Sequence, residues 1–127
     1  MAYETLTEET QGIVASIKRI IDEKRADIGQ HKHGIGWEYT GSDLLNLTDK
    51  LKNELNNSDF QVFKINVLHL VHNGSIQNRT GHVLVFPLNG SANFAPDEPL
   101  LACHHIEKER TIYGDHLDLI IVSLKKR

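Results

Sequence analysis

Histidine is the side chain in this sequence best suited to chemistry. The chain has eight histidines, and a neutral imidazole can bind a metal ion or act as a general base. Two pairs, His69 with His72 and His104 with His105, would point to opposite faces of a strand. The two in residues 31–33 lie in a glycine-rich segment, and no HExxH or Cys/His zinc pattern occurs. The spacing therefore predicts no metal site and no cofactor.

Two further groups invite a catalytic interpretation. The single cysteine, Cys103, precedes His104, but a cysteine nucleophile needs a base beside its thiolate, and adjacent strand residues point apart. A small buried cysteine in a strand is the more common case. Asp115, His116 and Asp118 are available for acid–base chemistry, without a specific pattern. No catalytic residue is assigned from these groups.

One enzyme alternative stays open, a metal-independent ribonuclease that uses His82 or His105 with Thr111 and Tyr113. Fourteen Lys and Arg stand against seventeen Asp and Glu, giving a net charge of -3, and aromatic residues make up only 6%. Such a chain offers little to hold RNA, whose binding depends on cationic and stacking side chains. A toxin-neutralising, immunity-type protein of similar size is the related alternative.

The composition is that of one folded domain, residues 1–127. Hydrophobic residues make up 39% and charged residues 24%, the balance of an ordinary globular protein. The expected division is a helical half at about 5–57 and a sheet half at about 60–124. The acidic N-terminal sequence lacks the pattern of a signal peptide, and no apolar run has the length of a membrane span. A cytoplasmic protein that binds neither nucleic acid nor membrane is expected.

An amphipathic helix is predicted over residues 6–28. Isoleucine and valine recur at helical spacing and form one apolar stripe, with charged residues opposite. Thr5 and Glu8 have the spacing of a capping box. Gly29 would end this helix, because glycine tolerates a positive φ.

The following segment, residues 29–41, is predicted to be a loop, since it holds several glycines and the only tryptophan, Trp37. A second helix is expected to begin at Thr40 or Ser42, with leucines on one face, and to end at residues 56–58.

After Asp59 the apolar residues alternate with a period of two, which is typical of strands. Asn73-Gly74 is a turn signal, and residues 89–99 are rich in Gly, Ser, Asn and Pro. Four strands are expected, at about 60–72, 81–88, 100–108 and 111–124. The predicted fold is α+β, with two N-terminal helices packed on a four-stranded antiparallel meander.

The strand at 81–88 is the predicted site for a partner or a second subunit. Pro87 cannot donate to a strand ladder, which favours an edge position, and an edge offers unpaired backbone groups to an added strand. A second interpretation stays open, in which Pro87 and polar neighbours protect the edge. The residues assigned to partner binding or to a dimer interface are Arg79, His82, Val83, Leu84, Val85 and Phe86.

Three stretches of the sequence, together with the order of elements, resemble the Tctex-type dynein light chains. They are Gln30-His31 followed by Trp37, the strand Phe63–Val67 that leads to His72-Asn73-Gly74, and the closing run from Thr111 to Ser123. This resemblance covers about residues 5–124. It implies a homodimer of small α+β subunits, exchanging a strand in some members, that binds extended or disordered segments of other proteins and has no catalytic residues. The expected function is therefore a non-enzymatic adaptor of the cytoskeleton that acts by β-strand addition.

Overall fold

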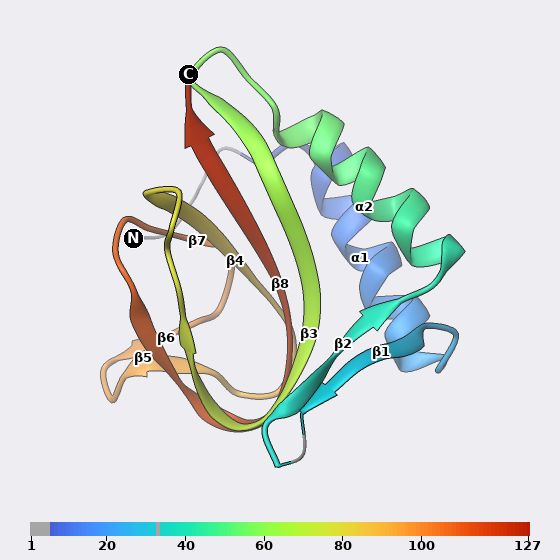
Figure 1. The fold of residues 1–127 in the computed structure, drawn as a ribbon, viewed down its shortest axis with the longest axis vertical. Helices are drawn as coiled ribbons and strands as arrows, with labels where there is room; N and C mark the ends of the chain where they lie inside the picture. Colours follow the sequence, from blue (N-terminus) through green and yellow to red (C-terminus); the bar gives the residue numbers. More distant parts are fainter. Residues whose placement is uncertain (1–5, 33) are drawn as a thin grey trace.

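The computed structural model describes residues 6–32 and 34–127, so the expectations for Thr5 and His33 lie outside the described residues. Within that part of the chain the fold is α+β, with two helices and a large antiparallel sheet of eight strands (Figure 1). The elements in chain order are α1 (Glu8–Asp22), β1 (Asp27–Lys32), β2 (Gly36–Thr40), α2 (Ser42–Leu55), β3 (Phe60–Ile76), β4 (His82–Asn89), β5 (Asn93–Ala95), β6 (Glu98–Pro99), β7 (His104–Ile106) and β8 (Arg110–Lys126).

The strand order is β1-β2-β3-β8-β4-β7, with β5 and β6 attached beside β8. The two longest strands, β3 and β8, pair along their whole length, from Phe60 opposite Lys126 to Ile76 opposite Arg110. Because β8 lies between β3 and β4, the expected meander is wrong, and so is the expected number of four strands. The run from Leu117 to Val122, which is apolar except for Asp118, explains the central position of β8, since buried side chains are needed on both of its faces.

The first helix is shorter than expected. Thr7 is its N-cap, and the Thr7 hydroxyl accepts a hydrogen bond from the backbone N–H of Thr10 at 3.1 Å. The helix ends at Asp22, well before Gly29. Lys24 has the left-handed conformation, with a φ of 56°, which ends a helix as a C-terminal glycine would.

The segment predicted to be a loop is a β-hairpin, formed by β1 and β2. Gly36 makes the pairing of β2 with β3 possible, because its φ is 151° and a Cβ atom there would lie 1.8 Å from the carbonyl oxygen of His69. The Trp37 ring stacks on the His69 ring, with centroids 4.2 Å apart. Figure 1 shows the hairpin diverging from the other strands and leading into the start of α2.

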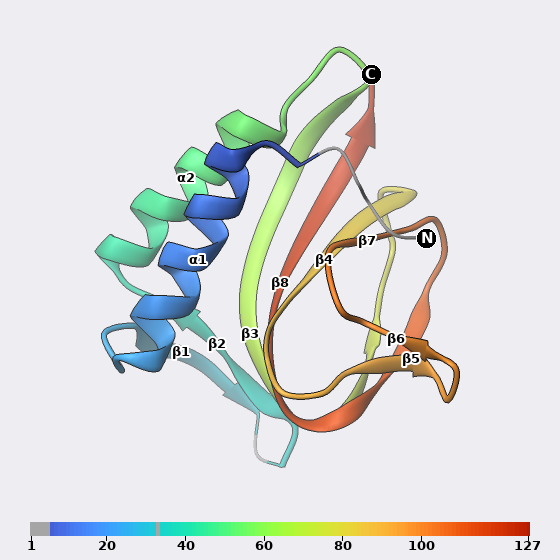
Figure 2. The same cartoon turned by 180° about the vertical axis from the view of Figure 1, so that it is seen from behind.

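The second helix begins at Ser42 and ends at Leu55, as predicted. Leu44, Leu51 and Leu55 are buried, whereas Leu45 is 54% exposed. Both helices lie on the same side of the sheet, side by side (Figure 2). Neither of these described helices combines the length and the apolar character that crossing a bilayer requires.

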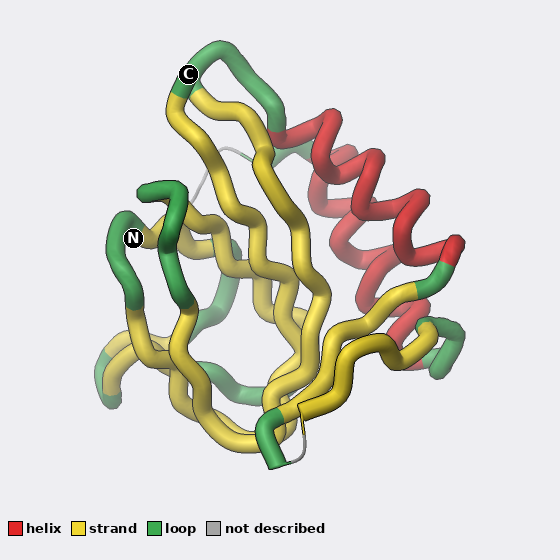
Figure 3. Tube along the Cα trace, in the orientation of Figure 1, coloured by secondary structure: helices red, strands yellow, loops and turns green. Residues whose placement is uncertain are grey.

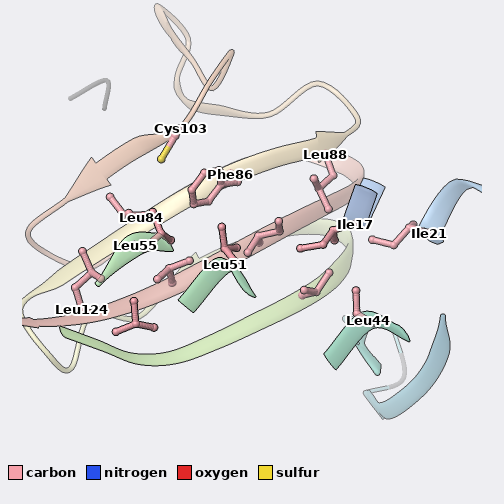
Figure 4. Packing of buried hydrophobic residues seen from close by; sticks show 14 residues of the cluster. Ile17, Ile21, Leu44, Leu51, Leu55, Leu84, Phe86, Leu88, Cys103 and Leu124 are labelled. Atoms are coloured by element: carbon pink, nitrogen blue, oxygen red, sulfur yellow. The ribbon is translucent and has the colours of Figure 1, made fainter. Parts of the chain in front are cut away.

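Two clusters of buried side chains form the core. One lies between the helices and the sheet, where α2 leucines point toward strand residues such as Leu84, Phe86 and Leu124 (Figure 4). The other lies on the opposite face, where β3 and β8 bend together and the sheet curls (Figure 3). The second cluster contains Val83, Val85, Ile106, Ile112, Leu117, Leu119 and Phe94.

The turn expected at Asn73-Gly74 lies inside β3. Asn73 has a φ of 48° at an irregularity of the ladder, and its side-chain oxygen accepts a hydrogen bond from the Gly114 N–H of β8 at 2.8 Å. The chain reverses only after Ile76.

The expected third strand is reduced to β7, the expected loop at 89–99 contains the short β5–β6 hairpin, and the last strand is confirmed as β8.

Cys103 is predicted to be inert to thiol reagents in the folded protein. It is 3% exposed, and burial raises the pKa of its thiol to about 12, so the reactive thiolate is nearly absent at pH 8. Ellman's reagent at pH 8 should label the protein only after denaturant is added. Rapid, complete labelling of the native protein would contradict this placement.

Candidate functional site

The predicted partner strand, β4, is an interior strand in this fold. It pairs with β8 on one side and with β7 on the other. Val83, Leu84, Val85 and Phe86 are each at most 2% exposed. The expectation that this strand is an edge is wrong, because β8 pairs along one side of it and the short β7 pairs with Val83, Leu84 and Val85 on the other. Arg79 is exposed and His82 is partly exposed, both at the start of the strand.

β3 has an open stretch of edge within the strand order, in addition to the outer edges of the terminal strands β1 and β7. β8 pairs with one edge of β3 throughout, but the ladder with β2 on the other edge covers only Leu68 to Leu70. At the start of β3, Asn56 and Asn57 accept hydrogen bonds from the N–H groups of Val62 and Phe60, at 2.7 Å each. Among the described residues no strand pairs with this outer edge at residues 63–67. We call residues 63–67 of β3 the open edge.

A hollow of about 320 Å³ lies beside the open edge on the helix side. Ile65 and Val67 of β3 line it, and both belong to the side of the sheet that packs on the helices. The other walls come from α2, β2 and Gly29 of β1. The lining residues there are Leu44, Leu45, Thr48, Gly29, Glu38, Tyr39 and Thr40.

A second hollow, of about 230 Å³, lies at the same strand edge and is lined by Asn66, Leu68 and Leu70, which alternate with Ile65 and Val67 along β3. Leu68 and Leu70 pack against the second core cluster, on the face of the sheet away from the helices. Ile35, Gly36, Trp37, Glu38 and His69 complete its lining. The helix-side hollow therefore lies beside the open edge, and the second hollow extends from Asn66 along the part of β3 that pairs with β2.

Glu38 lines both hollows. Its carboxylate accepts a hydrogen bond from the Asn66 side-chain amide at 2.6 Å, which fixes it beside the end of the β2–β3 ladder. The carboxylate places a negative charge at the open edge. A cationic side chain of a bound segment would be favoured there.

A buried carboxylate, Asp118 of β8, anchors β2 and so positions the walls of the hollows. Asp118 is 7% exposed, and it accepts hydrogen bonds from the Tyr39 hydroxyl at 2.7 Å, the Asn89 amide at 3.0 Å and the His69 Nδ1 at 2.9 Å. Since a carboxylate only accepts, neutral His69 carries its proton on Nδ1, and its Nε2 accepts from His116 Nδ1 at 3.2 Å. Four strands meet at this one group.

The Asp118 carboxylate also changes the acidity of Tyr39. Burial, and then the hydrogen bond to Asp118, raise the pKa of the Tyr39 phenol far above its usual value. Ionising the phenol would remove the donor and set two negative charges side by side. Tyr39 therefore stays protonated in the folded protein and holds the end of β2 to β8.

The residues of the ribonuclease alternative are not brought together. His82 and His105 lie next to each other, with Nδ1 of the first 2.9 Å from Nε2 of the second. Burial, and then His82, lower the pKa of His105. Thr111 pairs with Ser75 and Tyr113 with β5, toward the opposite end of β8 from the residue that pairs with His82. No His–Thr–Tyr site forms from these residues.

The sequence does not reveal the open edge, because the alternation of apolar residues predicts β3 as a strand but does not show which of its edges is paired. The signal that could have found it is the pair of glycines around β2, Gly36 and Gly41, which have positive φ values of 151° and 116°. They permit a short strand that pairs briefly and then turns toward α2. Glu38 and Tyr39 lie in that strand, which the sequence analysis treats as a loop.

Comparison with protein-family models, with curated proteins and with solved structures finds no match. The comparisons assign the chain to no family. The case for function is therefore made from the geometry of the open edge and its two hollows.

Replacing Tyr39 with phenylalanine is predicted to destabilise the protein by about 1–3 kcal/mol at pH 7, because a buried carboxylate loses a donor. The pKa of the phenol is raised in the folded state, so its contribution is complete below the unfolded pKa of about 10 and is lost as pH rises further. Urea titrations from pH 7 to 11 should show the free energy of unfolding falling more steeply above pH 10 in the wild type than in Y39F.

The matched control is Tyr113→Phe, which removes the hydroxyl of a tyrosine that is 47% exposed. Its stability should remain within about 0.5 kcal/mol of the wild type. Equal destabilisation by both variants would contradict the anchoring role of Tyr39.

Proposed function

We propose that this protein is a non-enzymatic binding module that takes up an extended segment of a partner protein by strand addition along the open edge of β3. The observation that carries the proposal is a stretch of strand edge, residues 63–67, with no strand opposite it among the described residues, a hollow on its helix side and a second hollow on the other face that begins at Asn66. Exposed strand edges carry backbone donors and acceptors that an added strand can satisfy.

The two hollows suit the geometry of an added strand. Successive side chains of a strand point to opposite faces, so neighbouring residues of the bound segment would enter the two hollows in turn. Leucine and isoleucine line both spaces, which favours apolar side chains. The Glu38 carboxylate between them favours a lysine or arginine in the segment. The preferred partner is therefore an extended segment with alternating apolar residues and a nearby basic residue.

Homodimerisation and kinship with the Tctex-type dynein light chains belong to the same proposal. Strand addition at an edge is the binding mode that the resemblance implies. The eight strands and the hairpin between the helices depart from the four-stranded arrangement expected on that resemblance. The proposed role is that of an adaptor, and the proposed compartment is the cytoplasm.

Leu45→Asp is predicted to weaken peptide binding at least about tenfold. The residue is exposed on α2 and lines the helix-side hollow, and loss of its apolar contact costs about 1.5 kcal/mol or more, equivalent to about a tenfold change in Kd. An acidic residue in the first turns of a helix is compatible with folding. A peptide selected from a random display library on the wild-type protein would serve as the probe, measured by calorimetry.

Leu101→Asp is the matched control, because Leu101 is 82% exposed and lines neither hollow. It should leave the affinity unchanged.

A second test is N-methylation of every other amide of the peptide. Methylation of the odd-numbered amides and methylation of the even-numbered amides should differ, with one abolishing binding and the other sparing it, since only one set of N–H groups faces the β3 edge. Equal affinities for the two leucine variants, or insensitivity to N-methylation, would exclude this mode of binding.

The homodimer predicts a mass of about twice 14.4 kDa by light scattering coupled to size exclusion. A mass of 14.4 kDa across the accessible concentration range would remove the dimer from the proposal. It would leave binding at the open edge intact, because the open edge is complete within one chain.

A further inference from the structure

Three side chains with metal-binding atoms converge at the border between β4 and β7. They are His82, His105 and Glu107, and one donor atom from each lies within 4.8 Å of the others. The two imidazoles are closest, with His82 Nδ1 2.9 Å from His105 Nε2. This group lies apart from the open edge of β3 and shares no residue with it.

The register of the two strands brings the three residues together. Leu84 is opposite His105, and Val83 is opposite Ile106. Glu107 directly follows the end of β7, and continuing this register by one residue places it opposite His82. His105 and Glu107 are two residues apart and therefore share a face. Cross-strand neighbours on one face lie about 5 Å apart at their Cβ atoms, which lets their side chains meet.

The donor set matches zinc chemistry. Two imidazole nitrogens and one carboxylate oxygen are common Zn²⁺ ligands, and a tetrahedral ion with bonds of about 2.0–2.1 Å holds its donors about 3.3 Å apart. The observed separations, from 2.9 Å between the nitrogens to at most 4.8 Å, bracket that value. Small rotations of the exposed Glu107 side chain and the two rings would close the site.

The surroundings support a bound ion. The Phe60 ring lies against both imidazoles, with centroids 4.8 Å from His82 and 6.0 Å from His105, and so limits their rotation. Glu107 is exposed, so water has access to the fourth position. A negative carboxylate beside two imidazoles also supplies the charge that a divalent cation needs.

We propose that His82, His105 and Glu107 bind Zn²⁺, with water as the fourth ligand. The ion ties the end of β7 to the start of β4. β7 has only three residues and pairs with β4 alone among the described strands. The ion therefore stabilises a terminal strand that is held by a ladder of only three residue pairs. This inference is independent of the proposed binding of an extended segment.

Calorimetric titration of the chelator-treated protein with zinc chloride tests the site. A single saturable site is expected, and Zn²⁺ should raise the Tm, with reversal by chelator, because a ligand that binds only the folded state stabilises it. Mg²⁺ should produce neither effect, since it prefers oxygen ligands. His105→Ala and Glu107→Gln should each weaken Zn²⁺ binding by at least about tenfold.

His104→Ala is the matched control. His104 is next to His105 on β7, but its ring lies 5.5 Å from that of Phe94 and its Nδ1 bonds the Ala102 carbonyl at 3.1 Å. This variant should bind Zn²⁺ as the wild type does. Glu107→Gln changes an exposed side chain and keeps its shape, so it separates loss of a ligand from loss of the fold. Absence of saturable Zn²⁺ binding, or equal affinity in H104A and E107Q, would overturn the proposal.

Discussion

The pairing of β3 with β8 is the constraint on which the rest of the structure depends. The two strands pair from Phe60 opposite Lys126 to Ile76 opposite Arg110, with irregularities between Val62 and Lys64 and between His72 and Gly74, although they are far apart in the sequence. This ladder takes one whole edge of β3 and puts β8 in the centre of the sheet. The other edge of β3 is left to β2, which is too short to cover it. The open edge is a direct consequence.

The hydrogen bonds of Asp118 determine where β2 leaves the sheet. A buried carboxylate is costly unless donors surround it, and here Tyr39, His69 and Asn89 supply them. Tyr39 belongs to β2, so satisfying Asp118 fixes the end of that strand above β8. The chain then turns through Gly41 into α2. The same arrangement that stabilises a buried charge positions Tyr39 and Thr40, which line the helix-side hollow together with residues of α2 and β3.

The sequence predicts the elements whose apolar pattern is strong and local. The leucines of α2 and the alternation of β8 are examples, and both elements lie close to their expected bounds. Long-range pairing could not be predicted. β4 has the proline of an edge strand, yet β8 and β7 flank it. β2 carries mixed polar and aromatic residues between glycines, so no period marks it as a strand. His82 and His105 meet only because of the β4–β7 register.

Hydrogen exchange of the backbone amides, with and without a bound peptide, tests the central claim most directly. An added strand should protect those amides of residues 63–67 whose N–H groups point away from β8, because their exchange would then require the peptide to dissociate. The account predicts that new protection centres on these residues and fades toward β8, which is already paired. Protection confined to β1 or β7, with residues 63–67 unchanged, would contradict it.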